Sequence, residues 1–484
     1  MSATGASLPS LRDRVRSAVI WRSGTQAFGQ LVAWAATFLV IRILTPADYG
    51  LYAMTGIVLA LLALVNGYGL ANALIREREA PPRLVRQLFG MLIVLNLALA
   101  AAQVALAPWV AAYYRQPVVA DMLRVQALLY LTNPFLALGY ALLTRRMDFR
   151  RQAQVNVVSA LIGAAAALGG ALGGLGVWTL VAAPLAQVGS RAAGMALAAG
   201  AWVRPSFDFR GAWHLAGFGG AVTLSGLFWF VQSQADVAIA GRAFDAHELG
   251  IYTTALFLAQ IFVTKLVPPL NEVAFAAFAQ VRDDRAAFAA GFLKSVRVVA
   301  LVALPFCLGL AATAEALVPV VLGPKWAETA PVIRILALAM PFATLQVLFA
   351  PAANAAGRPG LVTRTTVLGA VLMPLAFVVG VGWGAPGMAL AWLAAYPLLT
   401  AVSARWMLPA IGVRGRELVA AVAPPALAAV AMALVVAMID RWIGGPTPAL
   451  RLALLVAAGV SAYAGWLALF ARDRLGEAAA LLRR

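Results

Sequence analysis

Two basic side chains lie inside long apolar stretches of this chain, where a charge is costly and therefore informative. Arg22 precedes Arg42 by 20 residues, and Lys265 follows position 249 by 16 residues, or about 24 Å of helix at 1.5 Å per residue. At these depths a cation can bind an anionic group. The alternative is that each long side chain reaches the membrane interface and binds nothing.

One acidic side chain, Asp236, also lies in an apolar stretch, about 9 Å of helix before Arg242. Asp236 shares a helix face with Ser225, Trp229 and Gln232, because the four follow one another at intervals of three or four residues. A carboxylate on such a face, beside a wet cavity, can take up a proton or a sodium ion. A structural ion pair with Arg242 or another basic group is the alternative, and the sequence leaves both open.

Glutamine side chains form two further polar stripes at helical spacing. One stripe contains Arg22, Gln26 and Gln30, and the other contains Gln260 and Thr264. Both stripes are expected to face away from lipid, because an unpaired polar group in hydrocarbon costs several kcal/mol. Such stripes either hold helices together or line a polar path, and the occurrence of two of them favours the path. The predicted substrate-binding residues are Arg22, Gln26, Gln30, Trp229, Gln232, Gln260 and Lys265, and the predicted ion-coupling residue is Asp236.

The composition shows which kind of protein must position these residues. Hydrophobic residues make up 63% of the 484, charged residues only 12%, and the mean hydropathy is +0.87. A soluble domain is about 45–50% apolar and about 25% charged, so this composition indicates a membrane protein. The net charge of +18 is explained by basic cytoplasmic loops and does not indicate nucleic-acid binding.

Charged and Pro/Gly-rich breaks divide the chain into fourteen predicted spans. They cover residues 19–43, 50–75, 88–111, 122–143, 155–172, 176–200, 212–240, 249–273, 291–312, 330–354, 364–382, 387–406, 418–439 and 449–470. Of the 37 basic residues, 26 lie at ends that are cytoplasmic if the N-terminus is inside, eight lie at outer ends and three lie within spans. The positive-inside rule therefore predicts that both termini are cytoplasmic. The expected fold class is an all-α polytopic membrane protein with about 14 transmembrane helices.

An eleven-residue pattern occurs twice in the chain, 200 positions apart. RILTPADYGLY (42–52) and RAFDAHELGIY (242–252) share arginine, glycine and tyrosine at the same offsets, with an acid at Asp48 or Glu248. Both follow an apolar stretch on the outer face, which indicates two parallel six-helix lobes, as in alternating-access transporters. The predicted divisions are a cytoplasmic or interfacial segment 1–18, an N-lobe 19–204, a C-lobe 205–410, and two added helices with a cytoplasmic tail 411–484.

Four segments resemble the polysaccharide-transporter branch of the MOP superfamily, which contains Wzx- and WzxC-type oligosaccharide flippases. The segments are RILTPADYGLYAM, QADVAIAGRAFDAHELGIYTTA, PPLNEVAFAAFAQV and NAAGRPG, and the resemblance covers roughly residues 10–410. It implies movement of an undecaprenyl-diphosphate-linked oligosaccharide from the inner to the outer leaflet of the bacterial inner membrane. The expected partners are the lipid bilayer, this lipid-linked glycan, and a polysaccharide polymerase or ligase.

Other functions stay open on the sequence alone. A multidrug exporter or a peptidoglycan-precursor flippase of the same superfamily would share the lobes and the charged residues. A membrane-embedded polymerase or ligase is disfavoured, because the outer loops are short and the two histidines, His214 and His247, accompany no metal-ligand cluster or nucleophile motif. No catalytic residue, metal site or cofactor is therefore predicted, and the expected energy source is a proton or sodium gradient.

Overall fold

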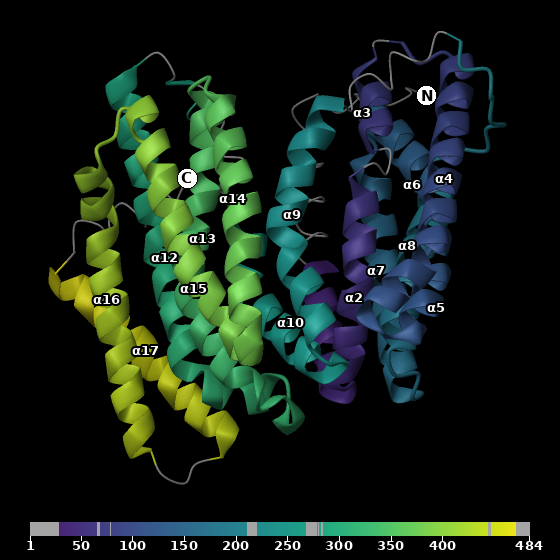
Figure 1. Ribbon diagram of the computed structural model, residues 1–484. Helices are drawn as coiled ribbons and strands as arrows, with labels where there is room; N and C mark the ends of the chain where they lie inside the picture. The colour runs from purple at the N-terminus through teal and green to yellow at the C-terminus, as the bar shows by residue number, and fades with distance from the viewer. Residues whose placement is uncertain are drawn as a thin grey trace, which may run out of the picture. The chain divides into compact units, whose positions relative to one another are not determined.

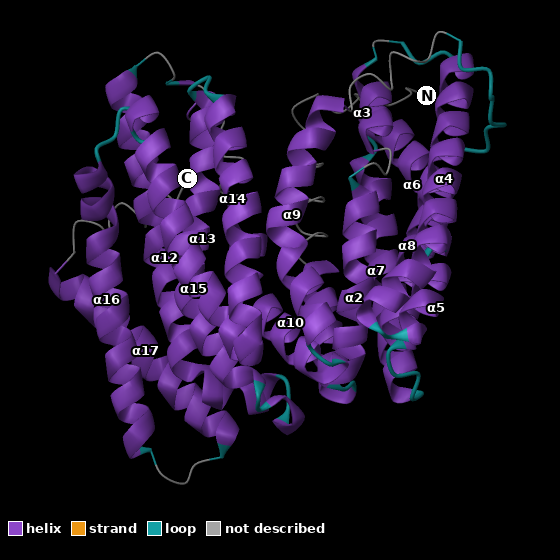
Figure 2. Ribbon diagram, in the orientation of Figure 1, coloured by secondary structure: helices purple, strands orange, loops and turns teal. Residues whose placement is uncertain are grey.

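The computed structural model describes residues 29–64, 68–77, 79–210, 220–267, 284–443 and 447–470, together with 278, 280 and 281. Over this part of the chain the structure is helical and contains no strand (Figure 2). The chain forms two compact units that divide between Gly226 and Leu227. The lobe boundaries inferred from the sequence stay predictions, and the predicted segment 1–18 lies outside the described residues.

The N-terminal unit is a bundle of helices that run up and down (Figure 1). Its helices are Gly29–Ile43, α2 (Pro46–Ala63), α3 (Tyr68–Arg76), α4 (Pro82–Tyr114), α5 (Pro117–Gln126), α6 (Leu128–Arg145), α7 (Phe149–Leu172) and α8 (Trp178–Ala199). α8 packs against both α6 and α7, and α4 packs against α5 and α6. The next helix, α9 (Gly220–Ala243), begins in this unit and continues into the other.

The C-terminal unit contains the rest of α9 and a second helical bundle. Its further elements are α10 (Ala246–Ile261), the π-helix η2 (Phe262–Leu266), α12 (Arg285–Val321), η3 (Pro324–Trp326), α13 (Thr329–Ala355), α14 (Pro359–Gly380), η4 (Val381–Trp383), α15 (Gly384–Met407), η5 (Pro409–Ile411), α16 (Gly415–Trp442) and α17 (Pro448–Phe470). α13 is central, since it contacts α10, α12, α14 and α15. The last two helices, α16 and α17, pack on α12 and on each other.

Every predicted span coincides with helix in the described chain. Ten helical stretches of the described residues are long and apolar enough to cross a membrane, and one of them, Pro359–Ile411, contains both α14 and α15. The helix Gly29–Ile43, α8 and α9 occupy the three remaining predicted spans. The predicted fold class, an all-α multi-pass membrane protein, is therefore confirmed.

The repeated eleven-residue pattern caps a helix in each unit. In the N-terminal unit the Asp48 N–H donates to Thr45 Oγ1 at 3.3 Å, and the Thr45 N–H donates to the Asp48 carboxylate at 2.9 Å. In the C-terminal unit the Glu248 N–H donates to the Asp245 carboxylate at 2.8 Å. Side-chain oxygens here satisfy N–H groups that a helix N-terminus leaves unpaired, so α2 and α10 begin at the same point of the pattern.

The acidic residue of each copy of the pattern, Asp48 or Glu248, also lies beside a glycine at the start of another helix. Glu248 Oε1 accepts a hydrogen bond from the Ala385 N–H at 2.9 Å, beside Gly384 at the start of α15. The Asp48 carboxylate lies beside Gly176, just before α8. Both glycines have a positive φ, +69° at Gly384 and +53° at Gly176, which residues with a Cβ rarely adopt. The same acid–glycine contact therefore occurs in both units.

In the N-terminal unit, two arginines at the predicted cytoplasmic end donate hydrogen bonds to backbone carbonyls at the C-termini of helices. Arg145 Nη1 donates to the carbonyl oxygens of Leu74 at 2.6 Å and Glu77 at 2.5 Å. Arg146 Nη1 donates to the carbonyl oxygen of Ala199 at 2.9 Å. The last carbonyls of a helix lack partners and carry partial negative charge, so these guanidinium groups stabilise the ends of α3 and α8.

Candidate functional site

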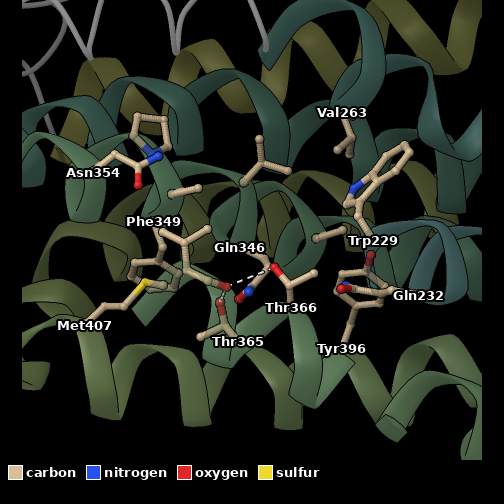
Figure 3. Close-up of a pocket in the computed structure, with 15 residues that line it drawn as sticks. Trp229, Gln232, Val263, Gln346, Phe349, Asn354, Thr365, Thr366, Tyr396 and Met407 are labelled. Atoms are coloured by element: carbon tan, nitrogen blue, oxygen red, sulfur yellow. Dashed lines mark hydrogen bonds between the residues drawn. The ribbon is translucent and has the colours of Figure 1, made fainter. Parts of the chain in front are cut away.

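A cavity of about 550 Å³ lies within the C-terminal unit, between α9, η2, α13, α14 and α15 (Figure 3). Its polar and aromatic lining consists of Trp229, Gln232, Gln346, Phe349, Asn354, Thr365, Thr366 and Tyr396. The remaining lining residues are apolar, and none of the residues that line the cavity carries a formal charge. The cavity is therefore suited to a neutral polar molecule or to a neutral part of a larger one.

Amide groups dominate the polar lining. Gln346 and Asn354 lie two turns apart on α13, with Ala350 between them on the same face. Gln346 Oε1 is buried and has no hydrogen-bond partner among the described residues. Trp229 leaves 61% of its surface exposed and offers a flat apolar ring. Amides donate and accept hydrogen bonds, so this combination can bind a ring that carries several hydroxyl groups.

Two threonines of α14 contribute acceptors to the cavity. The hydroxyls of Thr365 and Thr366 both donate to the carbonyl oxygen of Val362 at 2.9 Å, as the dashed lines in Figure 3 indicate. Because each hydroxyl proton is used within the helix, the oxygen lone pairs remain to accept hydrogen bonds from a ligand.

A buried carboxylate lies one turn beyond Gln232 on α9. Asp236 is 1% exposed, and its Oδ2 accepts a hydrogen bond from the Tyr252 hydroxyl at 2.9 Å. The Tyr252 hydroxyl accepts one from Trp392 Nε1 at 2.8 Å. The other carboxylate oxygen, Oδ1, is buried without a hydrogen-bond partner in the described part of the chain. That oxygen can accept a proton or a cation, and a buried polar atom without a partner costs free energy.

Ring contacts join this carboxylate to the cavity. Trp392 and Tyr396, one turn apart on α15, stack with ring centroids 5.0 Å apart and planes inclined by 6°. Tyr396 and Gln232 both line the cavity. α14 approaches so closely that a Cβ at Gly369 would overlap the Gln232 amide. The contacts therefore run unbroken from the buried carboxylate to the cavity wall.

The equivalent position in the N-terminal unit holds an apolar residue. The 200-residue offset between Tyr52 and Tyr252 places Ala36 opposite Asp236. Ala36 is 7% exposed and lies on the helix Gly29–Ile43, and Tyr52 packs against an apolar cluster. The two units thus share the acid–glycine contact but differ at the position of the buried carboxylate.

The structure brings three of the predicted site residues together. Trp229 and Gln232 line the cavity, and Asp236 follows them on α9. Gln260 is partly buried on α10, and its carbonyl oxygen accepts a hydrogen bond from Thr264 at 2.9 Å. These two residues are not among those that line the cavity.

The other predicted residues lie elsewhere. Lys265 is exposed on the π-helix η2, whose Val263 lines the cavity. Gln30 is partly buried on the helix Gly29–Ile43 of the N-terminal unit. Arg22 and Gln26 lie outside the described residues. The substrate-binding and coupling functions assigned to these residues from the sequence stay predictions.

Several residues of the site are absent from the sequence-based prediction. Gln346 and Asn354 carry a signal that could have found them, because their eight-residue spacing equals that between Arg22 and Gln30 at the two ends of a predicted polar stripe. Tyr252 belongs to the repeated pattern, but its hydrogen bond to another helix has no signature in a single sequence. Single aromatic residues in an apolar helix, such as Trp392, are ordinary and give no warning.

The helical fold is similar to two solved transporter structures. A structure described as the lipid II flippase MurJ in an inward closed conformation gives a TM-score of 0.75 at 11% identity, covering 94% of this chain and 100% of that chain. An inward-facing multidrug resistance MATE transporter of the MOP superfamily gives a TM-score of 0.60 at 15% identity, covering 82% of this chain and 98% of that one. The chain therefore shares the helical fold of these two structures.

Sequence comparisons identify the family within that class. Residues 39–331, more than half of the chain, match the family described as polysaccharide biosynthesis protein, and the chain belongs to that family. The succinoglycan biosynthesis transport protein ExoT of Rhizobium meliloti is 26% identical over 447 residues, which cover 90% of this chain and 88% of ExoT. The lipopolysaccharide biosynthesis protein WzxC of Escherichia coli is 22% identical over 333 residues, or 68% of this chain and 67% of WzxC. The resemblance to the polysaccharide-transporter branch is thereby confirmed, and the expectation of a transporter rather than an enzyme agrees with the transport function for which ExoT is named.

Proposed function

We propose that this protein is a flippase that moves an undecaprenyl-diphosphate-linked oligosaccharide from the inner to the outer leaflet of the bacterial inner membrane by alternating access. The uncharged, amide-lined cavity of the C-terminal unit is the observation that carries the proposal. Membership of the polysaccharide biosynthesis family supports it, as do relatives named for succinoglycan transport and lipopolysaccharide biosynthesis.

The cavity suits the glycan part of such a substrate. Sugar rings present apolar C–H faces, which pack on an aromatic ring such as Trp229, and hydroxyls at their edges, which pair with amides. Gln346 supplies a buried oxygen with no partner in the described chain, and Asn354 supplies a second amide on the same helix face. A ligand hydroxyl that donates to Gln346 Oε1 would remove the cost of a buried unpaired acceptor.

The diphosphate needs cations that the cavity does not contain. Arg22 and Lys265 are the residues that we assign to this part of the substrate, at the start of the path from the cytoplasmic leaflet. The assignment of that side follows from the excess of basic residues at one end of the spans, which also leads us to propose that both termini are cytoplasmic. A polysaccharide polymerase or ligase in the same membrane is the proposed downstream partner.

Asp236 is the proposed site of ion coupling. Its Oδ1 is buried without a partner in the described chain, and the contacts through Tyr252 and the α15 rings connect it to the cavity wall. A proton or a sodium ion that binds this oxygen would change the hydrogen bonding of the same rings that line the cavity. The site thereby couples occupancy by the ion to the shape of the cavity.

A deletion strain provides the test of the proposed substrate. Lipid extracts of the strain are expected to accumulate an undecaprenyl-diphosphate-linked oligosaccharide that, in spheroplasts, is protected from a glycosidase added outside. Protection from the added glycosidase distinguishes a flipping defect from a polymerase defect. In a polymerase defect the same lipid would lie in the outer leaflet, where the glycosidase can cleave it. Unchanged surface polysaccharide together with raised drug sensitivity would instead identify a multidrug exporter, and accumulated peptidoglycan precursor would identify a flippase for that lipid.

Complementation then tests the cavity itself. Trp229→Ala is expected to restore flipping about two- to twelvefold less well than wild type, because stacking on an aromatic ring contributes about 0.5–1.5 kcal/mol. Trp442→Ala is the matched control, since Trp442 is 86% exposed at the end of α16 and lies outside the cavity. Equal rescue by both variants, at equal protein levels, would remove the cavity from the glycan path.

A further inference from the structure

A second cavity, of about 760 Å³, lies at the arginine-rich end of the C-terminal unit. It is formed by the C-terminal turns of α15, by η5, and by the N-terminal ends of α12 and α16. Three arginines line it, Arg285, Arg405 and Arg414, and no acidic residue does. The cavity therefore has the charge expected of a binding site for an anion.

The local structure holds two of these arginines against the cavity. Arg285 is the first residue of α12, and its Nη2 donates to the carbonyl oxygen of Pro409 at 3.3 Å. Gly412 packs on the stem of Arg285, since a Cβ there would lie 3.2 Å from Arg285 Cγ. Arg414 is the N-cap of α16, and its backbone N–H donates to the Glu417 carboxylate at 2.9 Å. Fixed backbones thus present cationic side chains from separate elements to one space.

The third arginine shows what kind of anion fits. Arg405 shares a face of α15 with Ala401 and Leu398, which precede it by one and two turns. Leu398 is 53% exposed, and Trp406 beside Arg405 is 39% exposed. An exposed apolar face within a membrane-spanning helix thus leads directly to a cationic cavity. This arrangement matches an amphiphile whose chain lies along α15 and whose anionic head reaches the arginines.

The positive-inside rule places arginines at this end of a membrane protein whatever they bind. It does not explain why three of them, from three different elements, line one cavity without an acidic neighbour among the lining residues. We propose that this cavity binds the phosphate-bearing headgroup of an anionic lipid. Guanidinium groups bind phosphate through paired, charge-assisted hydrogen bonds, which lysine cannot reproduce.

Native mass spectrometry of the purified full-length protein, delipidated in detergent, tests this inference. Phosphatidylglycerol and phosphatidylcholine are added in turn, and bound adducts are counted for wild type, Arg405→Ala and Arg414→Ala. Each variant is expected to bind phosphatidylglycerol about fivefold more weakly, the usual effect of one basic side chain near an anionic lipid. Arg414→Ala keeps the backbone hydrogen bond of the cap, so loss of folding does not explain such a result.

The matched control is Arg364→Ala, because Arg364 is exposed near the N-terminus of α14 and does not line the cavity. Its phosphatidylglycerol binding should stay within twofold of wild type, and phosphatidylcholine binding should not change in any variant. An equal loss in the control would overturn the site in favour of general surface charge.

Further ligands distinguish the sources of the phosphate. Competition by a polyprenyl diphosphate, lost in Arg405→Ala, would support a lipid site and identify the substrate headgroup as an occupant. Competition by inorganic diphosphate at the same concentration as the lipid would overturn the lipid proposal, since a chain along α15 would then contribute nothing. Because none of these measurements involves transport, the inference stands or falls independently of the proposed flippase activity.

Discussion

Replacing Tyr252 with phenylalanine removes one hydroxyl that serves two buried partners. It deletes the 2.9 Å hydrogen bond to Asp236 and the 2.8 Å bond from Trp392, while the ring still fills a position that is 0% exposed. A hydrogen bond to a charged group contributes about 1.5–3 kcal/mol and a neutral one about 0.5–1.5 kcal/mol. Tyr252→Phe is therefore expected to lower the free energy of unfolding by about 2–4 kcal/mol.

The measurement is chemical unfolding of the purified protein in mixed detergent micelles. Tyr463→Phe is the matched control, because the Tyr463 hydroxyl makes one hydrogen bond, 2.8 Å to the carbonyl oxygen of Leu301. It should lose about 1 kcal/mol. In an Asp236→Ala background, Tyr252→Phe removes only the bond from Trp392 and should also cost about 1 kcal/mol.

The two tyrosine variants and the double mutant together test whether the Tyr252 hydroxyl makes both hydrogen bonds. Losses of equal size for Tyr252→Phe and Tyr463→Phe would refute the two-partner description of the Tyr252 hydroxyl. Additive effects of Tyr252→Phe and Asp236→Ala would refute a direct interaction between the two side chains, since contacting residues show coupling energies of about 0.5–3 kcal/mol.

Three substitutions test other close contacts. Gly369→Ala should displace the Gln232 amide and abolish flipping at normal protein levels, which would be measured as accumulation of the lipid-linked oligosaccharide. Gly360→Ala should not abolish flipping, because a Cβ at Gly360 would have no atom within 4 Å. Gly384→Ala should cost about 1–3 kcal/mol of unfolding free energy, because φ is +69° there. Arg145→Ala should leave the backbone carbonyls of Leu74 and Glu77 without their arginine partner. Backbone amide hydrogen exchange should then become faster near the end of α3 and stay unchanged in the C-terminal unit.

Most of the helical architecture could be predicted from apolar runs and breaks. Each of the fourteen spans coincides with helix where its residues are described, because a chain in lipid must satisfy its backbone hydrogen bonds within each segment. The breaks inside spans were harder to predict. The predicted span 50–75 covers most of α2 and α3, and the predicted span 249–273 covers most of α10 and all of the π-helix η2. Such interruptions depend on packing against neighbouring helices, which a local pattern does not record.

The site was predictable where its residues share one helix. Trp229, Gln232 and Asp236 follow helical spacing on α9, and the structure places two of them on a cavity and the third beside it. The partner of Asp236 was not predictable, because the sequence offered Arg242 and the structure supplies Tyr252 from α10. The distance between helices is set by close approaches such as that at Gly369, and no spacing rule along the chain encodes it.

The difference between Ala36 and Asp236 limits the energetics of transport. If the coupling ion binds at Asp236, this pair of equivalent positions carries one charge per cycle and not two. One elementary charge moved across the membrane supplies about 2.3 kcal/mol per 100 mV. For the charge of the ion alone, that free energy corresponds to a concentration ratio of roughly fiftyfold per 100 mV, since every 1.4 kcal/mol is a factor of ten. The chain thus repeats the acid–glycine contact in both units but has a buried carboxylate at only one of these two equivalent positions, so this pair of positions couples one charge.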